Sequence, residues 1–204
     1  MARRFSMIRD FHLADLFTLG NGACGAAAVF LAIDYASGGG TGSIYAAGAT
    51  IAAALVFDML DGRVARWRHR ASEMGKELDS LADVISFGVA PAAVAYALGL
   101  RGALDVAALL FFVACGISRL ARYNVTAAAL ASGGDKVAYF EGTPIPTSVL
   151  LVGVLVFLVW RGWVGDAFPG GTLPVLGSSF HPFVLGFVVS GSLMISKTIH
   201  IPKP

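Results

Sequence analysis

Asp58-Met-Leu-Asp61-Gly62-Arg-Val-Ala65-Arg66 is the stretch of sequence that decides the fold, and its pattern continues to Gly75, Asp79 and Asp83. It places four carboxylates within 26 residues of a chain that is otherwise strongly apolar. A charged carboxylate at bilayer depth costs about 2.5–3.5 kcal/mol or more, so four together require a compensating partner. Divalent cations suit this role, because hard oxygen ligands and a doubly charged ion offset each other's desolvation. We therefore expect the chemistry of the protein here.

The composition is that of an integral membrane protein. Hydrophobic residues make up 56% of the 204 residues and charged residues only 14%, with a mean hydropathy of +0.74. Soluble domains contain about 25% charged residues. The lipid bilayer is therefore the expected surrounding of the chain, and no nucleic-acid partner is expected.

Six apolar stretches are long enough, or nearly so, to span a bilayer as helices of about 20 residues. We predict an all-α membrane fold with six transmembrane helices in a single domain over residues 1–204. Residues 1–15 are expected to form a short amphipathic helix at the interface, because Phe5–Phe17 mixes apolar and charged residues. The predicted spans are residues 16–36, 44–66, 78–100, 103–125, 145–163 and 180–197.

The distribution of positive charge predicts the orientation of the chain. Thirteen of the 15 Lys and Arg residues lie in the N-terminus, the C-terminus and the segments 63–76 and 119–136. The opposite side retains only Arg101 and Arg161. Cytoplasmic segments are enriched in Lys and Arg, so both termini and the aspartates are predicted to face the cytoplasm of a cell or inner membrane.

The spacing of the aspartates predicts two carboxylate pairs. Asp58 and Asp61 are three residues apart and Asp79 and Asp83 are four apart, so each pair shares one face of its own helix. The 17 residues between Asp61 and Asp79 allow the chain to turn near Gly75 and return antiparallel. Facing pairs of this kind suit two divalent ions about 3.5–4 Å apart that clamp a phosphoryl group.

The residues beside the first pair suit a phosphate-containing ligand. Gly62 and Ala65 leave room for a nucleotide or diphosphate to approach the backbone, and Arg66 supplies a fixed positive charge. The alternative is that the aspartates pair with the five Lys and Arg residues of the 63–76 segment as a solvated charged cap.

The aspartate run resembles the signature of the CDP-alcohol phosphotransferase family, D-x2-D-G-x2-A-R-x8-G-x3-D-x3-D. The resemblance extends from about Leu16 to Pro146, and six helices with a cytoplasm-facing site are typical of that family. Every fixed position is met, by Asp58, Asp61, Gly62, Ala65, Arg66, Gly75, Asp79 and Asp83.

The resemblance implies roles for these residues. The four aspartates would surround two metal ions, Mg²⁺ or Mn²⁺, and Asp83 would be the general base that takes the proton of the acceptor alcohol. The family also includes homodimers, which the resemblance makes an expectation here. The residues implied in binding the CDP-linked donor are Asn21, Gly62, Ala65, Arg66 and Gly75.

A second region bears on the acceptor alcohol. The runs Arg119-Leu-Ala-Arg122-Tyr-Asn124 and Tyr139-Phe-Glu141-Gly-Thr143-Pro-Ile-Pro146 resemble two elements of the phosphatidylserine synthase subgroup. Serine carries a carboxylate and an ammonium, so Arg119 or Arg122 would bind the former, and Asn124 or Glu141 the latter. Thr143 is the remaining candidate in this loop. The alternative is that both arginines are interfacial anchors or diphosphate contacts and that Glu141 caps a helix.

The expected activity is transfer of a phosphatidyl group from CDP-diacylglycerol to the hydroxyl of L-serine, giving phosphatidylserine and CMP. Glycerol 3-phosphate or inositol phosphate as acceptor, and CDP-archaeol as donor, are the alternatives within the same chemistry. A divalent-cation transporter is the alternative of another class, because carboxylates within membranes also mark ion pathways. Against it, no acidic residue is predicted at mid-membrane depth.

Overall fold

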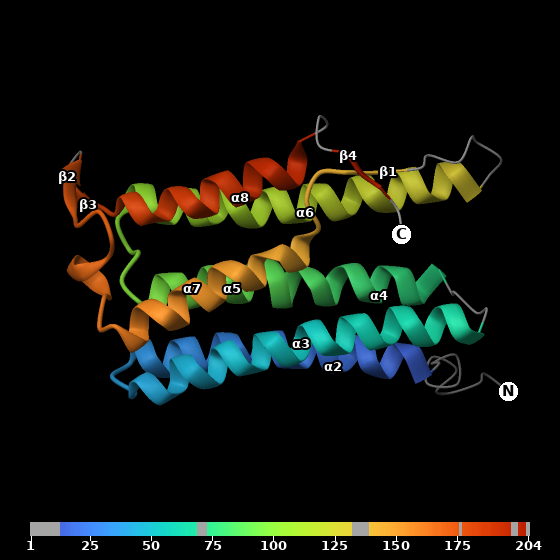
Figure 1. Ribbon diagram of the computed structural model, residues 1–204, viewed down its shortest axis with the longest axis horizontal. Coiled ribbons are helices and arrows are strands. Elements are labelled where there is room, and N and C mark those ends of the chain that lie inside the picture. Colours follow the sequence, from blue (N-terminus) through green and yellow to red (C-terminus); the bar gives the residue numbers. More distant parts are fainter. Residues whose placement is uncertain (1–12, 69–72, 132–138, 176, 197–199, 203–204) are drawn as a thin grey trace, which may run out of the picture.

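The apolar runs of the sequence form long helices that lie nearly parallel to one another (Figure 1). The computed structural model describes residues 13–68, 73–131, 139–175, 177–196 and 200–202. Most of the predicted amphipathic segment, residues 1–12, lies outside the described residues.

Four helical segments are long and apolar enough to cross a membrane. Helix α2 covers Leu13–Ala36, α3 covers Thr41–Arg68 and α6 covers Ala103–Ala131. The remaining segment is continuous from α4 (Glu73–Asp83) through the π-helix η1 (Val84–Val89) to α5 (Ala90–Ala97). These segments correspond to the first four predicted spans.

The last two predicted spans are shorter than the sequence suggested. The 3₁₀ turn η2 (Ile145–Ser148) leads into α7 (Val149–Trp160), and η4 (Pro182–Val184) leads into α8 (Leu185–Ile195). Ile145–Trp160 rises about 24 Å at 1.5 Å per residue, which is less than the roughly 30 Å of a hydrocarbon core. An all-helical membrane fold is therefore supported, but six full spans are not established by helix length.

Two small strand pairs depart from the all-α prediction. Strand β1 (Tyr139–Glu141) pairs antiparallel with β4 (His200–Pro202), with Phe140 opposite Ile201. At the other end of the molecule β2 (Leu173–Val175) pairs with β3 (Ser178–Phe180), just after the short 3₁₀ helix η3 (Gly165–Ala167). Three of these strands lie in connections between helices and β4 follows α8, so their backbone groups need partners outside a helix.

The π-helical turn immediately follows Asp83, the last of the four aspartates. Pro91 comes just after it and has no N–H to donate to the Phe87 carbonyl one turn earlier. Single π-turns inside α-helices are rare and occur frequently at functional sites. Here the widened turn buries Ser86, Phe87 and Gly88 against neighbouring helices.

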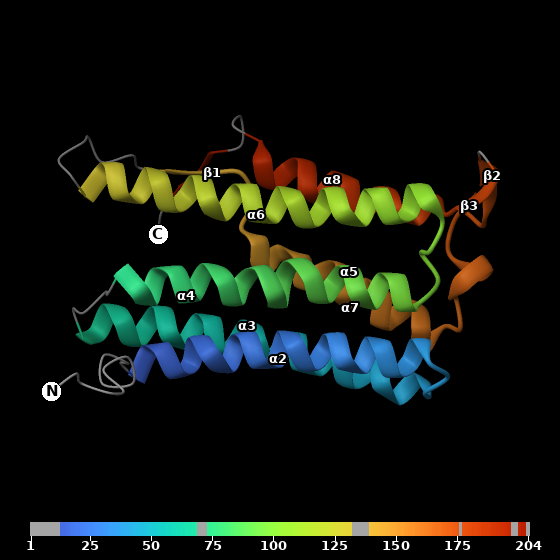
Figure 2. The same ribbon diagram turned by 180° about the vertical axis from the view of Figure 1, so that it is seen from behind.

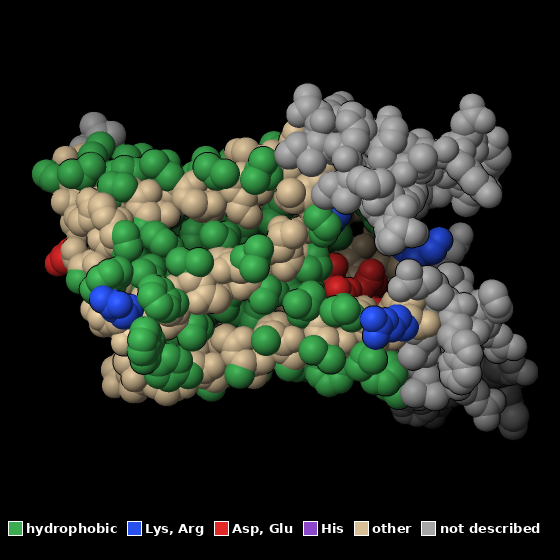
Figure 3. All heavy atoms as spheres, viewed as in Figure 1, with side chains coloured by type: hydrophobic (Ala, Val, Ile, Leu, Met, Phe, Trp, Pro, Cys, Tyr) green, Lys and Arg blue, Asp and Glu red, His purple; other side chains and the backbone are tan. Residues whose placement is uncertain are grey.

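The core is made largely of small and aliphatic side chains, and the surface is apolar. Ala28, Ala32, Ala47 and Ala54 are buried where α2 and α3 pack together, so the two backbones approach closely. Large hydrophobic side chains remain exposed along the long helices, for example Phe30 at 69%. Green hydrophobic atoms accordingly cover much of the face in Figure 3. This distribution fits helices that face lipid.

The helix segments that carry the aspartates lie together at one end of the bundle. Figure 2 shows the C-terminal end of α3, the start of α4 and the end of α6 grouped there, with β2 and β3 at the opposite end. Helix α2 packs against α3, α4 and η1. It therefore forms a support behind both helices that carry aspartates.

Candidate active site

Three of the four aspartates form one carboxylate cluster. Antiparallel helices α3 and α4 bring Asp58, Asp61 and Asp79 together, with one oxygen of each within 4.8 Å of the others. The i, i+3 spacing in α3 turns its two carboxylates to the same side, as the sequence predicts. The Oδ1 atom of Asp79 is buried and has no hydrogen-bond partner among the described residues.

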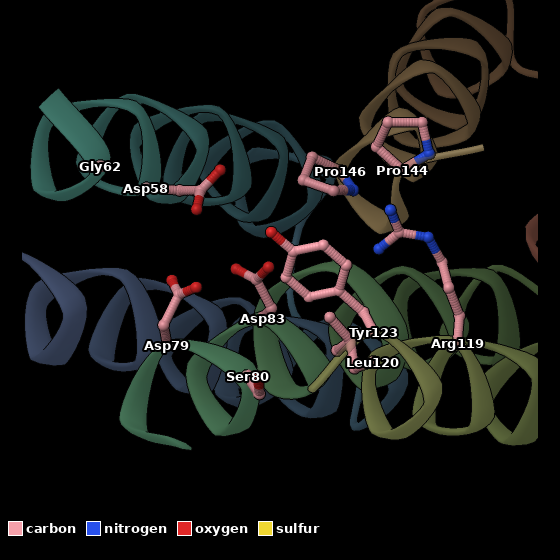
Figure 4. Close-up of a pocket in the computed structure, with 10 residues that line it drawn as sticks. All are labelled: Asp58, Gly62, Asp79, Ser80, Asp83, Arg119, Leu120, Tyr123, Pro144 and Pro146. Atoms are coloured by element: carbon pink, nitrogen blue, oxygen red, sulfur yellow. The ribbon is translucent and has the colours of Figure 1, made fainter. Parts of the chain in front are cut away.

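Asp83 lies beside this cluster and has its own partner. It is buried at 6% exposure, and its Oδ1 accepts a hydrogen bond from Asn21 Nδ2 at 3.0 Å. Figure 4 shows its carboxylate turned into the same space as those of Asp58 and Asp79. The structure thus brings all four predicted carboxylates into one region, with Asp83 one helical turn deeper along α4.

The carboxylates open into a cavity of about 510 Å³. Red acidic atoms are visible at the bottom of an opening near one end of the molecule in Figure 3. Asp61 does not line this cavity; it is buried behind it and accepts a hydrogen bond from Thr18 Oγ1 at 2.8 Å. The lining residues are Asp58, Gly62, Asp79, Ser80, Asp83, Arg119, Leu120, Tyr123, Pro144 and Pro146.

Helix α6 supplies the opposite wall of the cavity. Arg119 and Tyr123 are four residues apart, so both side chains lie on the face of α6 that lines the cavity. Figure 4 shows the Arg119 guanidinium near Pro144 and Pro146, and the Tyr123 ring reaching toward Asp83. The Nε of Arg119 is buried and has no hydrogen-bond partner in the described part of the chain. Arg119 is the single cationic side chain among the described residues that line the cavity.

Arg122 points elsewhere, although both arginines were predicted to have the same candidate role. Its Nη1 donates a hydrogen bond to the Ile195 carbonyl at 3.3 Å, at the C-terminal end of α8. A cation at this end of a helix interacts favourably with the unpaired carbonyls and the helix dipole. The structure therefore separates Arg119 at the cavity from Arg122 at the α6–α8 contact.

Asn124 bonds to Ser80 across the gap between α6 and α4. Its Nδ2 donates to Ser80 Oγ at 3.0 Å, and its Oδ1 lies 3.3 Å from the same hydroxyl. Ser80 itself lines the cavity. Asn124, predicted to bind serine or phosphate, thus links the acidic wall to the α6 wall.

The loop before α7 closes the cavity from a third side. Pro144 and Pro146 line it, and Gly142 is held against the end of α8 with φ +73°. A Cβ on Gly142 would collide with the Met194 carbonyl, and the Thr143 N–H donates to the Leu193 carbonyl at 3.1 Å. Thr143 is half-buried. The backbone of Glu141 is in β1, but its side chain lies outside the described residues.

Comparison with known proteins gives this site a family. The sequence model of the CDP-alcohol phosphatidyltransferase family matches residues 11–179. The chain is also 46% identical over 205 residues to the CDP-diacylglycerol–serine O-phosphatidyltransferase of Saccharomyces cerevisiae, covering 98% of this chain and 74% of the relative. The chain belongs to the CDP-alcohol phosphatidyltransferase family. This confirms the resemblance stated from the aspartate run.

The match to two further relatives covers a smaller share of each relative. The CDP-diacylglycerol–serine O-phosphatidyltransferase of Mycobacterium leprae is 47% identical over 123 residues, which are 57% of this chain and 40% of that protein. The archaetidylserine synthase of Methanothermobacter thermautotrophicus is 38% identical over 143 residues, 69% of this chain and 55% of that protein. The chain thus spans about three quarters of the yeast relative and less than two thirds of the other two.

The other residues of the family signature differ in how they relate to the cavity. Gly62 lines the cavity, and Gly75 lies on α4 one turn before Asp79. Ala65 and Arg66 belong to the last turns of α3, but their side chains lie outside the described residues. Asn21, predicted to bind the donor, is fully buried and contacts Asp83 instead of lining the cavity.

Three polar residues at this site were not among the residues predicted from the sequence. Ser80 and Tyr123 line the cavity, and Thr18 donates to Asp61. The signal for Thr18 was present: it lies three residues before Asn21, so the two form a polar face on an otherwise apolar helix. A signal for Tyr123 was also present, because it lies in the quoted run from Arg119 to Asn124 and shares a helix face with Arg119 four residues earlier. No comparable pattern marks Ser80.

The acidic residues at the opposite end are engaged locally. Asp105 receives bonds from the Gly102 N–H at 3.1 Å and the His181 N–H at 2.9 Å, and its Oδ2 lies 2.6 Å from His181 Nδ1. Asp34 accepts from Ser43, and Asp166 accepts from Thr172. Among the described residues, no acidic side chain joins these to the active-site end, which argues against a transport path.

The donor set of the cluster fits a divalent cation. All three clustered side chains offer carboxylate oxygens, the ligands that hard ions such as Mg²⁺ and Mn²⁺ prefer. The buried, unpartnered Asp79 Oδ1 also needs a partner that the described protein atoms do not provide. This region can therefore hold metal.

Proposed function

We propose that this chain is a CDP-diacylglycerol–serine O-phosphatidyltransferase. It joins the hydroxyl oxygen of L-serine to the β-phosphorus of CDP-diacylglycerol, breaks the bond from that phosphorus to the CMP oxygen, and releases CMP and phosphatidylserine. The carrying observation is one cavity with aspartates on one wall and, among the described lining residues, a single cation, Arg119, on the other. The names of the yeast and mycobacterial relatives support the same activity.

The donor diphosphate is proposed to bind at the acidic wall. Asp58, Asp61, Asp79 and Asp83 would hold two ions, Mg²⁺ or Mn²⁺, which when bound offset the diphosphate charge and polarise the phosphorus. Gly62 leaves the backbone open to the nucleotide, since a Cβ placed there would meet nothing within 4 Å. The other proposed donor residues are Ala65, Arg66 and Gly75, whereas Asn21 is buried and bonds to Asp83.

The acceptor is proposed to bind between Asp83 and Arg119. Arg119 would take the serine carboxylate, because its buried Nε lacks a partner and a guanidinium binds carboxylates in a bidentate manner. Asp83 would accept the proton of the serine hydroxyl as that oxygen attacks, since a hydroxyl is a weak nucleophile without a base. The other proposed contacts to the acceptor are Glu141, Thr143 and Asn124.

Serine fits the cavity better than the phosphorylated alcohols. Glycerol 3-phosphate and inositol phosphate carry a dianionic group that calls for several cations. Arg119 is the one cation among the described lining residues, and Arg122 bonds to the end of α8. CDP-archaeol is a second candidate donor, because the archaetidylserine synthase relative matches 69% of this chain.

The membrane arrangement is proposed from the charge pattern and the fold together. Residues 1–204 would be one domain with six spans, in which α7 and α8 cross with help from their flanking turns. Both termini and the site would face the cytoplasm, and two chains would form a homodimer. A cysteine at exposed Lys76 should then react from the cytoplasmic side only, and light scattering should give twice the chain mass.

An acceptor panel tests the function most directly. Purified protein receives CDP-diacylglycerol and Mn²⁺ with serine, glycerol 3-phosphate, inositol phosphate or ethanolamine, and CMP release is measured. Serine alone should raise CMP release well above the acceptor-free rate, with phosphatidylserine identified by mass. Faster release with another alcohol would reassign the acceptor, and substituting CDP-archaeol would identify the preferred donor.

A further inference from the structure

Helix α2 contacts one aspartate of each pair, although it carries none of the four itself. Thr18 Oγ1 donates to Asp61 Oδ2 at 2.8 Å, and Asn21 Nδ2 donates to Asp83 Oδ1 at 3.0 Å. Thr18 and Asn21 are three residues apart, so both lie on one face of α2. The two bonds join positions 43 and 62 residues apart in the sequence.

These two contacts are shielded from water. Thr18 is 3% exposed and Asn21 is 0%, while Asp61 and Asp83 are 7% and 6%. Hydrogen bonds donated to a carboxylate are short and strong, and a buried polar group cannot exchange them for water. The orientation of both carboxylates is therefore tied to the position of α2.

The other two aspartates differ in this respect. Asp58 and Asp79 are half-buried and line the cavity, and Asp79 Oδ1 has no partner among the described residues. One carboxylate of each pair, Asp61 or Asp83, thus accepts a hydrogen bond from α2, and Asp83 also lines the cavity. Among the described residues, no side-chain hydrogen bond to Asp58 or Asp79 accompanies these two.

Close packing holds α2 in the position that these bonds require. A Cβ added to Gly25 would lie 2.6 Å from the Ser86 Cα, so only glycine lets α2 approach η1 this closely. Ser86 Oγ then donates to the Asn21 carbonyl at 2.8 Å. The π-turn therefore contacts Asn21 through Ser86, and the side chain of the same Asn21 donates its hydrogen bond to Asp83.

We infer that Thr18 and Asn21 are positioning residues, which hold Asp61 and Asp83 in a fixed orientation for binding a divalent cation. The inference rests on the proposed function, because it assumes that the aspartates bind metal. Residues that orient metal ligands contribute strongly to affinity, and their loss costs about 10–100-fold in metal affinity or activity. A preorganised ligand also avoids the entropy of being ordered when the ion binds.

Direct Mn²⁺ binding to the purified full chain, without substrate, tests this inference. Thr18→Val replaces the hydroxyl with a methyl group at nearly constant shape, and Asn21→Leu removes the N–H donor at similar volume. Thr18→Ser restores a donor at the first position. Thr50→Val is the matched control, because the Thr50 hydroxyl bonds to the Ala47 carbonyl of its own helix and not to an aspartate. Free Mn²⁺ is measured from its electron paramagnetic resonance signal.

We expect Thr18→Val and Asn21→Leu to raise the Mn²⁺ dissociation constant about tenfold or more, with Thr18→Ser and Thr50→Val within about twofold of the parent. In turnover assays the apparent KM for Mn²⁺ should rise while that for serine stays constant. The thermal midpoint in EDTA verifies that each variant is folded. If Asn21→Leu does not fold, Thr18→Val decides, and Mn²⁺ binding equal to that of Thr50→Val would overturn the inference.

Failure of the proposed function gives a different result. If the parent chain itself binds no Mn²⁺ and releases no CMP, the metal-dependent transferase assignment fails for all variants alike. If the parent binds Mn²⁺ and turns over serine while Thr18→Val binds Mn²⁺ equally well, only the positioning role is lost.

Discussion

The two walls of the cavity are built in different ways. The acidic wall comes from two helices that are adjacent in the sequence, and buried hydrogen bonds from α2 hold two of its four carboxylates. The opposite wall combines α6 with the loop before α7, and the buried Nε of its cation has no hydrogen-bond partner among the described residues. Contacts from α2 thus organise part of the acidic wall, whereas the described protein groups leave Arg119 Nε, like Asp79 Oδ1, unsatisfied.

The largest expected effect comes from removing a carboxylate of the acidic wall. Asp79→Asn should reduce CMP release by about 1,000-fold or more, because a neutral amide neither neutralises a cation nor binds it as strongly. The protein should remain folded in the membrane, since Asp79 Oδ1 has no hydrogen-bond partner to lose among the described residues. Asp34→Asn, at the far end beside Ser43, is the control and should retain turnover. Near-normal activity of Asp79→Asn would remove the metal site.

A smaller effect is expected from the opposite wall. Arg119→Ala should raise the KM for serine by about 10–100-fold, because a charged hydrogen bond contributes about 1.5–3 kcal/mol and each 1.4 kcal/mol is tenfold. The KM for CDP-diacylglycerol should stay unchanged. Initial rates over serine and donor concentrations measure both.

Arg122→Ala is the matched comparison within the same helix. Its loss should lower stability by about 0.5–1 kcal/mol through the end of α8 and leave the serine KM within about twofold. An equal rise in serine KM for both arginines would mean that the acceptor wall extends to Arg122. A raised donor KM for Arg119→Ala would assign that residue to phosphate instead.

The smallest effect is expected where the two walls meet. Ser80→Ala and Asn124→Ala should each lower kcat about three- to tenfold, since a single neutral hydrogen bond contributes about 1 kcal/mol. Because both variants break the same contact, the double variant should be no slower than either single one. Ser192→Ala, whose hydroxyl bonds within its own helix, is the control. A rise in serine KM for Asn124→Ala alone would instead indicate direct contact with serine.

Predictions that depend on local periodicity agree with the structure. The i, i+3 spacing of Asp58 and Asp61 and the short turn to Asp79 bring those three carboxylates within 4.8 Å of one another. The first four apolar stretches are continuous helical segments of at least 22 residues. Both results follow from helix geometry, which places residues three or four apart on one face whatever surrounds the helix.

Predictions that depend on which helix lies opposite were less successful. The sequence could not distinguish Arg119 from Arg122, because the packing of α6 between the cavity and α8 decides which arginine meets the ligand. It also gave no indication that Asn124 would bond to Ser80, 44 residues away. The lengths of the last two helices were overestimated, since the predicted spans included residues 161–163 and 180–181, which belong to the connection between α7 and η4.

The sequence by itself determined the membrane class, the family and the carboxylate pairs, because composition and local spacing carry that information. Only the tertiary structure decided that Asp61 and Asp83 are held by Thr18 and Asn21, and that Asp61 alone of the four lies off the cavity. The physical reason is that a hydrogen bond between side chains 43 or 62 residues apart depends on the distance and rotation between two helices. Those quantities are set by packing at positions such as Gly25 and Ser86, and not by the spacing within either helix.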